Sequence, residues 1–282
     1  MLSIIICSRE PKFNFKLFEN IKETVGREYE IIVIDNSKSK YSIAEAYNRG
    51  INQAKFPYLI FVHEDVLLHT SNWGKNLIDI FLKNPDVGLI GVAGSKTKTK
   101  MPSAWWELGE NVWHIVQHFK YKPKEYWKQG FEKDSLVEVA VIDGVFMAML
   151  NNEKIRFDER LPGFHNYDLS ISLQHQKISR KVVVTSEILI EHFSEGNLNK
   201  SWYISTSKFH RFYRRFLPSY VGNFSHSSSV LRKKEIIFGN EFINKLLDES
   251  LFKEALYWWW QLFKLKPVSK YHSKILSRLL FK

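Results

Sequence analysis

LIFVHEDVLL, residues 59–68, begins with four apolar residues in a row and then places three ionisable side chains together. An uninterrupted apolar run of this length is typical of a strand that is buried on both faces of a sheet. His63, Glu64 and Asp65 stand at its end, and in open α/β sheets ligands bind beyond the carboxyl ends of the strands. These side chains therefore either cap the strand in water or are delivered by it to a functional site.

Further short apolar runs alternate with helical patterns along the first 200 residues. Strands are expected at SIIIC (3–7), EIIVID (30–35), VGLIGVAG (87–94), within LVEVAVIDGVFMAML (136–150), at KVVVT (181–185) and, as an extended segment, at ILIEHF (188–193). Helices are expected at residues 14–25, 42–55 and 168–179, and Ser42 with Glu45 has the spacing of a capping box. This alternation predicts an α/β fold with a mostly parallel sheet flanked by helices.

Two segments depart from this pattern. Residues 96–130 are dense in Lys, Trp and Pro without a steady period, which indicates a long functional insertion or lid, or alternatively a plain irregular connection. After about residue 200 the chain becomes basic, aromatic and helical. We therefore expect a domain over residues 1–200 and a helical C-terminal region over residues 201–282.

The composition is that of an ordinary globular protein, with 44% apolar and 25% charged residues among 282. The 41 Lys and Arg residues against 30 Asp and Glu give a net charge of +11, which suggests an anionic partner such as nucleic acid, phospholipid or a phosphorylated small molecule. The single cysteine, Cys7, excludes an intramolecular disulfide and zinc sites with two cysteine ligands. Since neither a signal-peptide pattern nor a membrane-spanning apolar run is seen, we expect a cytoplasmic protein, with the inner face of the membrane as an alternative location.

Candidate site residues stand at the ends of the expected strands. Asp35 and Asp65 suit a nucleotide site, in which one carboxylate accepts hydrogen bonds from base or ribose and the other holds a divalent cation against a diphosphate. Ordinary turn chemistry is the alternative. His63 and Asp65 share a face of an extended segment, so they could also bind a transition metal together with His192, unless His63 is structural. The phosphate-loop pattern GxxxxGK[ST], a GxGxxG turn after the first strand and the hydrolase pattern GxSxG do not occur.

Together these features resemble the GT-A glycosyltransferases of the large inverting family 2, and more closely a glycosyltransferase-like branch of it. The resemblance covers about residues 1–200. It rests on SIIICSRE (3–10), EIIVIDNS (30–37), AEAYNRGINQAK (44–55), LIFVHEDV (59–66), FDERLPGFHNYDLSISLQ (157–174) and EHFSEG (191–196). The order and spacing of these pieces imply a GT-A fold with a basic helical C-terminal extension.

The resemblance also assigns donor-side roles. It implies that Asp35 contacts the nucleotide, with uracil as the expected base, and that Asp65 is the metal-coordinating last residue of a D-x-D motif for Mn or Mg. His63 replaces the first Asp of that motif, and an imidazole can bond ribose or water but brings no negative charge. His192 matches a late histidine that completes the metal shell in some relatives. Four further residues are grouped with the donor contacts, although Glu64 is also read as a spacer: Ser8, Arg9, Asn48 and Glu64.

On the acceptor side, relatives carry Glu-Asp followed two residues later by Asp, where this chain has HNYD, residues 165–168. Asn166 cannot be a base, so Asp168 is the expected catalytic base, with His165 behind it. A helix N-cap is the alternative role of Asp168. Asp143 falls where relatives place acceptor or donor contacts, and Gly144 beside it would permit close backbone approach.

Several aromatic and basic residues have two possible roles each. Trp105 and Trp106 are either core aromatics or a platform that stacks on sugar. Arg211 lies in SKFHRFYRRF (207–216), near the segment that in relatives closes over the donor phosphates, or on a solvated helix face. The last helix could lie on an anionic membrane surface or pack on the domain, since basic residues recur every four positions with apolar residues between them: Lys270, Lys274, Arg278 and Lys282.

The sequence therefore predicts a metal-dependent, inverting sugar transfer from a nucleotide-sugar to a glycan, glycolipid or protein-glycan acceptor. One alternative is a binding module in which the altered motifs have lost catalysis. A nucleotidyltransferase is a second alternative, although that chemistry normally uses a glycine-rich turn after the first strand. Nucleic acid is not expected as a partner, because no RNA-reading motif accompanies the basic tail.

Overall fold

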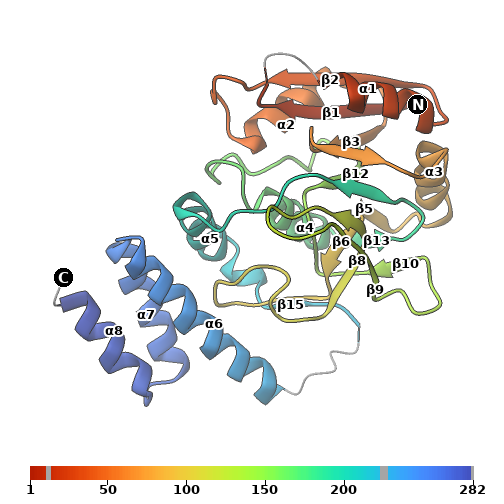
Figure 1. The fold of residues 1–282 in the computed structure, drawn as a ribbon. Helices are drawn as coiled ribbons and strands as arrows, with labels where there is room; N and C mark the ends of the chain where they lie inside the picture. Colours follow the sequence, from red (N-terminus) through yellow and green to blue (C-terminus); the bar gives the residue numbers. More distant parts are fainter. Residues whose placement is uncertain (11–13, 223–227, 281–282) are drawn as a thin grey trace.

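A seven-stranded sheet forms the centre of the computed structural model, which describes residues 1–10, 14–222 and 228–280 (Figure 1). Its strand order is β10-β13-β5-β12-β3-β1-β2. The strands are β1 (Leu2–Ser8), β2 (Tyr29–Asp35), β3 (Tyr58–Val62), β5 (Val87–Gly91), β10 (Leu136–Glu138), β12 (Phe146–Leu150) and β13 (Lys181–Thr185). The sheet is mixed: β1 runs parallel to β2 and β3, and β13 parallel to β5, while β12 runs antiparallel to both β3 and β5, and β10 antiparallel to β13. The predicted α/β class is confirmed.

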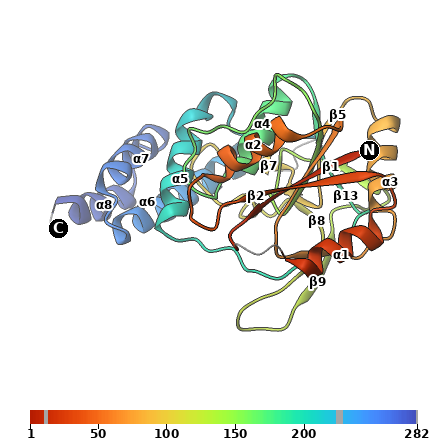
Figure 2. The same ribbon diagram turned by 90° about the horizontal axis from the view of Figure 1, so that it is seen from above.

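Helices cover both faces of this sheet. They are α1 (Phe15–Thr24), α2 (Ile43–Gln53), α3 (Trp73–Lys83) and α4 (Tyr167–Lys177). Within β1, Ile4 and Ile6 pack with α1 and α3, whereas Ile5 and Cys7 pack with α2 and α4, as the strand alternation requires. Figure 2 shows α1 and α2 on opposite sides of β1. The predicted capping box at Ser42 is confirmed, since the Ser42 hydroxyl accepts from the backbone N–H of Glu45 and the Glu45 carboxylate accepts from that of Ser42.

Residues 59–68 contribute to two strands in different sheets, and the expected strand before the ionisable triplet is the first of them. The chain leaves β3 at Val62, turns through residues 63–65 and enters β4 (Val66–Leu68), which pairs with β14 (Ile190–His192). The turn is fixed from outside, because the Asn14 side chain donates to the Glu64 carbonyl at 3.0 Å. The ionisable triplet thus forms the crossing between two sheets.

The second sheet has the order β11-β6-β8-β14-β4, with β9 paired to β8. Its other strands are β6 (Ala93–Ser95), β8 (Asn111–Gln117), β9 (Glu125–Gln129) and β11 (Val141–Ile142). Residues 96–130 are therefore not a plain irregular connection, because they contribute the β8–β9 hairpin and β7 (Thr97–Lys98). The sequence shows no steady period here because both faces of β8 carry apolar side chains, which hides the two-residue alternation of a strand.

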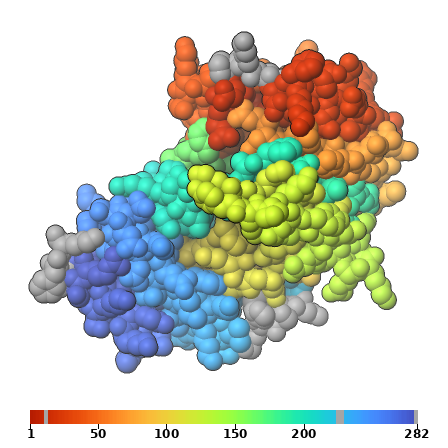
Figure 3. All heavy atoms as spheres, viewed as in Figure 1, coloured from red at the N-terminus to blue at the C-terminus, as the bar shows by residue number. Residues whose placement is uncertain are grey.

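The C-terminal region packs its own apolar cluster. It contains α5 (Lys200–Phe212), a short 3-10 helix (Arg214–Phe216), β15 (Ser219–Tyr220, paired with β7), α6 (Ser228–Asp248), α7 (Phe252–Leu265) and α8 (Lys270–Leu280). Figure 3 shows these blue helices against the yellow segment of the second sheet. The apolar face of α8 packs inward, with Ile275 fully buried and Leu279 against the same cluster. Of the two predicted roles of this helix, the structure therefore shows packing. Lys282 lies outside the described residues, and no helix within them has the length and apolar character to cross a bilayer.

Candidate active site

Three potential metal ligands converge where the turn between β3 and β4 meets the end of β14. One nitrogen or oxygen atom from each of His63, Asp65 and His192 lies within 4.8 Å of the other two. Asp65 Oδ1 is 3.7 Å from His192 Nε2 and 4.0 Å from His63 Nδ1. Two imidazoles and a carboxylate are a donor set suited to a divalent transition metal. The structure thus brings together the three residues that the sequence suggested as metal ligands.

Neighbouring side chains hold both imidazoles in orientation. His192 Nδ1 lies 3.0 Å from the side-chain oxygen of Gln117 and donates to it, which leaves the lone pair of Nε2 directed at Asp65. His63 Nε2 is bonded to the Tyr167 hydroxyl at 2.8 Å, so that its Nδ1 faces the carboxylate. Ligands that are already held in place favour metal binding, because their side chains lose little conformational entropy when the ion binds.

The electrostatics of the cluster also favour a cation. Burial tends to raise the pKa of Asp65, but a hydrogen bond from Ser194 and the neighbouring histidines outweigh it and hold the pKa below its ordinary value. Burial lowers the pKa of His192 to about 4, and the nearby His63 adds to this effect. At neutral pH the cluster therefore offers a carboxylate and an unprotonated imidazole, which are the forms that bind metal.

Glu64 points away from this cluster and joins the turn to the end of β1. Its carboxylate accepts from the Ser8 hydroxyl at 2.8 Å, and from the Arg9 backbone N–H and Nε, both at 3.0 Å. The structure thus brings together three residues predicted on the donor side. In this arrangement their polar groups bond one another and fix the position of residues 63–65.

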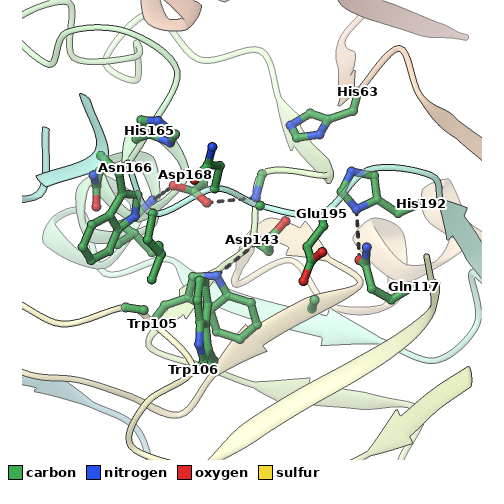
Figure 4. A pocket seen from close by; sticks show the side chains of 18 of the residues that line it. His63, Trp105, Trp106, Gln117, Asp143, His165, Asn166, Asp168, His192 and Glu195 are labelled. Atoms are coloured by element: carbon green, nitrogen blue, oxygen red, sulfur yellow. Dashed lines mark hydrogen bonds between the residues drawn. The ribbon is translucent and has the colours of Figure 1, made fainter. Parts of the chain in front are cut away.

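A cavity of about 430 Å³ lies beside the cluster (Figure 4). His63 and His192 lie on one side of it, Trp105 and Trp106 on another, and Asp143 between them. Its remaining lining includes the acceptor-side residues His165, Asn166 and Asp168, and the aromatic residues Trp113, Phe119, Trp127, Phe164 and Trp202. His63 and His192 of the cluster and the acceptor-side residues therefore meet at one cavity.

Asp168 is a buried carboxyl group at the start of α4. Its oxygens accept from the backbone N–H groups of Gly144 and Leu169, each at 2.9 Å. Burial raises its pKa to about 7, and the negative charge of Asp143 adds to the shift. The N-cap position belongs to Asn166, with φ at 63°, so Asp168 stands inside the first turn and is not the cap. A carboxyl group with a pKa near 7 can exchange a proton at neutral pH.

The chain segment around Gly144 is closely packed against α4. A Cβ atom at Gly144 would lie 2.1 Å from the Tyr167 hydroxyl oxygen, so the close approach that this glycine permits is that of the Tyr167 ring. Tyr167 in turn holds His63. The donor-side and acceptor-side halves of the cavity are thereby connected through one buried tyrosine.

Sequence comparison now identifies the family. The sequence profile described as the glycosyltransferase-like family matches residues 3–217. The chain belongs to this family. No curated protein sequence matches the chain significantly.

Solved structures agree on the fold. Staphylococcus aureus TarS 1–349 in complex with UDP has a TM-score of 0.54 at 12% identity, over 98% of this chain and 86% of that one. GalNAc-T7, crystallised with UDP, GalNAc and Mn²⁺, has a TM-score of 0.52 at 13% identity, over 83% of this chain and 54% of that one. This chain thus spans about half the length of GalNAc-T7. The glycosyltransferase-like chain has the GT-A fold.

Besides Ser8, Arg9 and Glu64, three predicted donor contacts of this glycosyltransferase-like chain lie apart from the cavity lining. Asp35 is exposed at the end of β2, next to Ser8 in register, and accepts from the Ser37 backbone N–H at 2.9 Å. Asn48 is buried and its amide bonds the backbone of Phe157 in both directions. Arg211 lies over the Tyr257 ring at 4.5 Å. The donor roles of all three remain predictions.

His165 and Asn166 connect the acceptor side to α5. His165 Nε2 lies 3.1 Å from the Ser201 hydroxyl, and burial lowers its pKa. The Asn166 amide donates to the hydroxyls of Ser205 and Thr206, at 3.2 and 3.1 Å. Asn166 therefore fixes α5 against the cavity. A carboxylate at this position could not donate these two hydrogen bonds.

One wall of the cavity in the glycosyltransferase-like chain is aromatic, and sequence reasoning proposed only Trp105 and Trp106 as possible parts of it. Five aromatic rings form it in an unbroken series, with neighbouring centroids 4.9 to 6.1 Å apart: Trp106, Trp105, Trp113, Trp127 and Phe119. Trp105 also donates from Nε1 to Asp143 at 3.0 Å. The available signal was the two-residue spacing of Trp113, Ile115 and Gln117, which places all three on one face of β8.

The C-terminal helices hold the loop that carries Trp105. The buried carboxylate of Glu235, on α6, accepts from the backbone N–H groups of Lys100 and Met101 at 2.6 and 2.5 Å. Within the loop, Lys98 is fully buried and donates from Nζ to the Ser103 carbonyl at 2.7 Å. Trp105 is therefore positioned by a region outside the central sheet.

Proposed function

We propose that this chain transfers a sugar from a nucleoside-diphosphate sugar, with a UDP-sugar as the first candidate, to a carbohydrate-bearing acceptor with inversion at the anomeric carbon. The observation that carries the proposal is the His63–Asp65–His192 cluster opening onto the same cavity as Asp143 and Asp168. Support comes from the family and from GT-A structures that were crystallised with UDP or with UDP, GalNAc and Mn²⁺.

On the donor side, His63, Asp65 and His192 would hold a divalent cation. When bound, such an ion supplies positive charge that stabilises the leaving diphosphate. The donor set contains one carboxylate and two imidazoles, so it carries less negative charge than a pair of aspartates. Imidazole ligands suit transition metals better than Mg, and GalNAc-T7 was crystallised with Mn²⁺, so we propose Mn as the preferred ion.

On the acceptor side, Asp168 accepts the proton of the attacking hydroxyl. The bond from the acceptor oxygen to the anomeric carbon forms while the bond from that carbon to the diphosphate breaks, and the proton passes to the carboxylate. The pKa of about 7 suits this task at neutral pH. Asp143 lies beside it, oriented by bonds from Trp105 Nε1 and from the Val145 backbone N–H.

The aromatic wall is proposed as the acceptor platform. Trp105 and Trp113 both line the cavity, and the apolar faces of sugar rings stack on such surfaces while their hydroxyls reach polar groups. Gln117 and Glu195 supply polar groups at the same cavity. A glycan or a glycolipid headgroup fits this combination.

Calorimetric titration of UDP tests the donor side, with and without Mn²⁺, on the wild type and on Asp65→Ala. Asp86→Ala is the matched control, because Asp86 is an exposed aspartate paired with Lys181 outside the cavity. We expect Mn²⁺-dependent UDP binding in the wild type and the control, and its loss in Asp65→Ala. Binding that is equal in all three proteins would contradict the proposed metal site.

A binding module without catalysis is the second candidate, and the replacement of an acidic D-x-D residue by His63 favours it. Release of UDP from UDP-sugars over time separates the two candidates. Turnover that falls in Asp168→Asn while UDP binding is kept supports transfer. UDP binding without turnover on any UDP-sugar and acceptor supports the module.

A further inference from the structure

Helix α7 carries an apolar face that the described residues leave uncovered. Phe252, Leu256 and Trp260 recur every four residues, and 37%, 52% and 46% of their surfaces are exposed. Trp260 also stacks on Phe263, with centroids 5.5 Å apart and planes 8° from parallel. The opposite side of α7 is buried in the C-terminal cluster. The exposed face is thus a continuous stripe of large side chains, and we call it the α7 stripe.

Two lysines flank this stripe, in a region of net positive charge. Lys253 and Lys264 are exposed on the same side of α7 by helical spacing, and Lys264 Nζ lies 5.3 Å from the centroid of the Trp260 ring. Residues 201–282 contain 15 Lys and Arg against 5 Asp and Glu, a net of +10 within the chain's total of +11. Almost all of the excess charge therefore belongs to the region that carries the stripe.

We propose that the α7 stripe binds the surface of an anionic phospholipid membrane. Large apolar side chains flanked by lysines are the composition of helices that lie in the interface, where the rings enter the acyl boundary and the ammonium groups reach the headgroups. This assignment moves the membrane contact predicted for the last helix to α7, since α8 uses its apolar face for packing.

The charge distribution favours lipid over other occupants of the stripe. Two copies of this chain would bring two regions of net +10 together, which opposes self-association. Nucleic acid would use the lysines, but Phe252 and Leu256 would gain nothing from a phosphate backbone. An anionic bilayer is the partner that satisfies both the apolar side chains and the charge, and this inference does not depend on the proposed sugar transfer.

Co-sedimentation of the full chain with vesicles tests the proposal. The vesicles consist either of phosphatidylcholine alone or of phosphatidylcholine with phosphatidylglycerol. We expect binding to the anionic vesicles and little to the neutral ones, because each positive charge near an anionic surface strengthens binding about fivefold. Failure to bind the anionic vesicles would overturn the proposal.

A variant of the stripe and a control variant on another helix test the apolar contribution. The double variant Leu256→Ser with Trp260→Ser should bind at least about tenfold more weakly, since it removes the inserted side chains. Leu82→Ser with Lys75→Glu on α3 is the matched control, because both residues are exposed outside the C-terminal region, and it should bind like the wild type. Unchanged binding of the α7 variant would show that the vesicles attract only the positive charge of the protein, and it would refute the inference. A wild-type oligomer that this variant converts to a monomer would assign the stripe to self-association and refute it as well.

Discussion

Replacing Asp168 by Asn should change how the stability of the protein depends on pH. The folded state holds the Asp168 proton up to a pKa of about 7, whereas an unfolded chain releases it near pH 3.9. Below about pH 4 this group therefore does not change the free energy of unfolding. As the pH rises to about 7, it lowers that free energy progressively. Three pKa units correspond to about 4 kcal/mol of unfolding free energy, which the wild type loses over that range.

The variant should not show this loss. It also gives up one acceptor, because a single amide oxygen cannot serve the N–H groups of both Gly144 and Leu169, at a cost of about 1–3 kcal/mol that is independent of pH. We thus expect Asp168→Asn to be less stable than the wild type near pH 4 and more stable by about 1–3 kcal/mol near pH 8.

Urea unfolding of both proteins at the two pH values measures this difference. Asp158→Asn is a control of opposite sign: burial raises the pKa of Asp158, but bonds from Arg160 and Tyr213 outweigh it and lower the pKa. Its carboxylate stabilises the fold above the unfolded pKa and stops doing so as the pH falls, so its removal costs stability near pH 8. If the difference between the wild type and Asp168→Asn were the same at both pH values, the raised pKa and the argument for Asp168 as the base would be refuted.

Three further substitutions have definite expected outcomes. Gly144→Ala should lower the unfolding free energy by about 1–3 kcal/mol and weaken Mn²⁺ binding, because the new methyl group displaces Tyr167 and so releases His63; thermal unfolding and calorimetry measure the two effects. Glu235→Gln should lower the free energy of unfolding by about 1–3 kcal/mol, because the side-chain amino group of glutamine would face the backbone N–H of Lys100 or Met101. Urea unfolding measures this, and an unchanged value would contradict the loop contact. Ser42→Ala should cost about 1 kcal/mol through loss of the capping box, and a neutral result would show that the cap is not needed there.

Much of the central sheet could be predicted because its strands are buried on both faces. Apolar runs such as residues 3–7 and 181–185 coincide with β1 and β13 to within a residue. The change of sheet within residues 59–68 could not be predicted in this way. Each half of that segment reads as a strand, and the turn is held by Asn14 and by the end of β1, which are distant in sequence.

The ionisable residues of the candidate site could be predicted from the sequence. His63, Asp65 and His192 stand out because ionisable groups follow apolar runs. Trp113 and Trp127 did not stand out, since an aromatic residue in a strand is usually core and only the three-dimensional hairpin shows which face meets the cavity. The exposed stripe of α7 was likewise hidden, because all sides of that helix carry large apolar residues.

The insertion of β14 between β4 and β8 has a consequence during synthesis of the chain. His69 on the β4 side bonds Glu191 of β14 across 122 residues, and His63 bonds Tyr167 across 104. Until β14 leaves the ribosome, β4 and β8 present unpaired edges that invite aggregation. A nascent or clipped chain that ends before β14 would therefore be a substrate for chaperones, and it would lack His192, so the metal cluster could be completed only after the second sheet had closed.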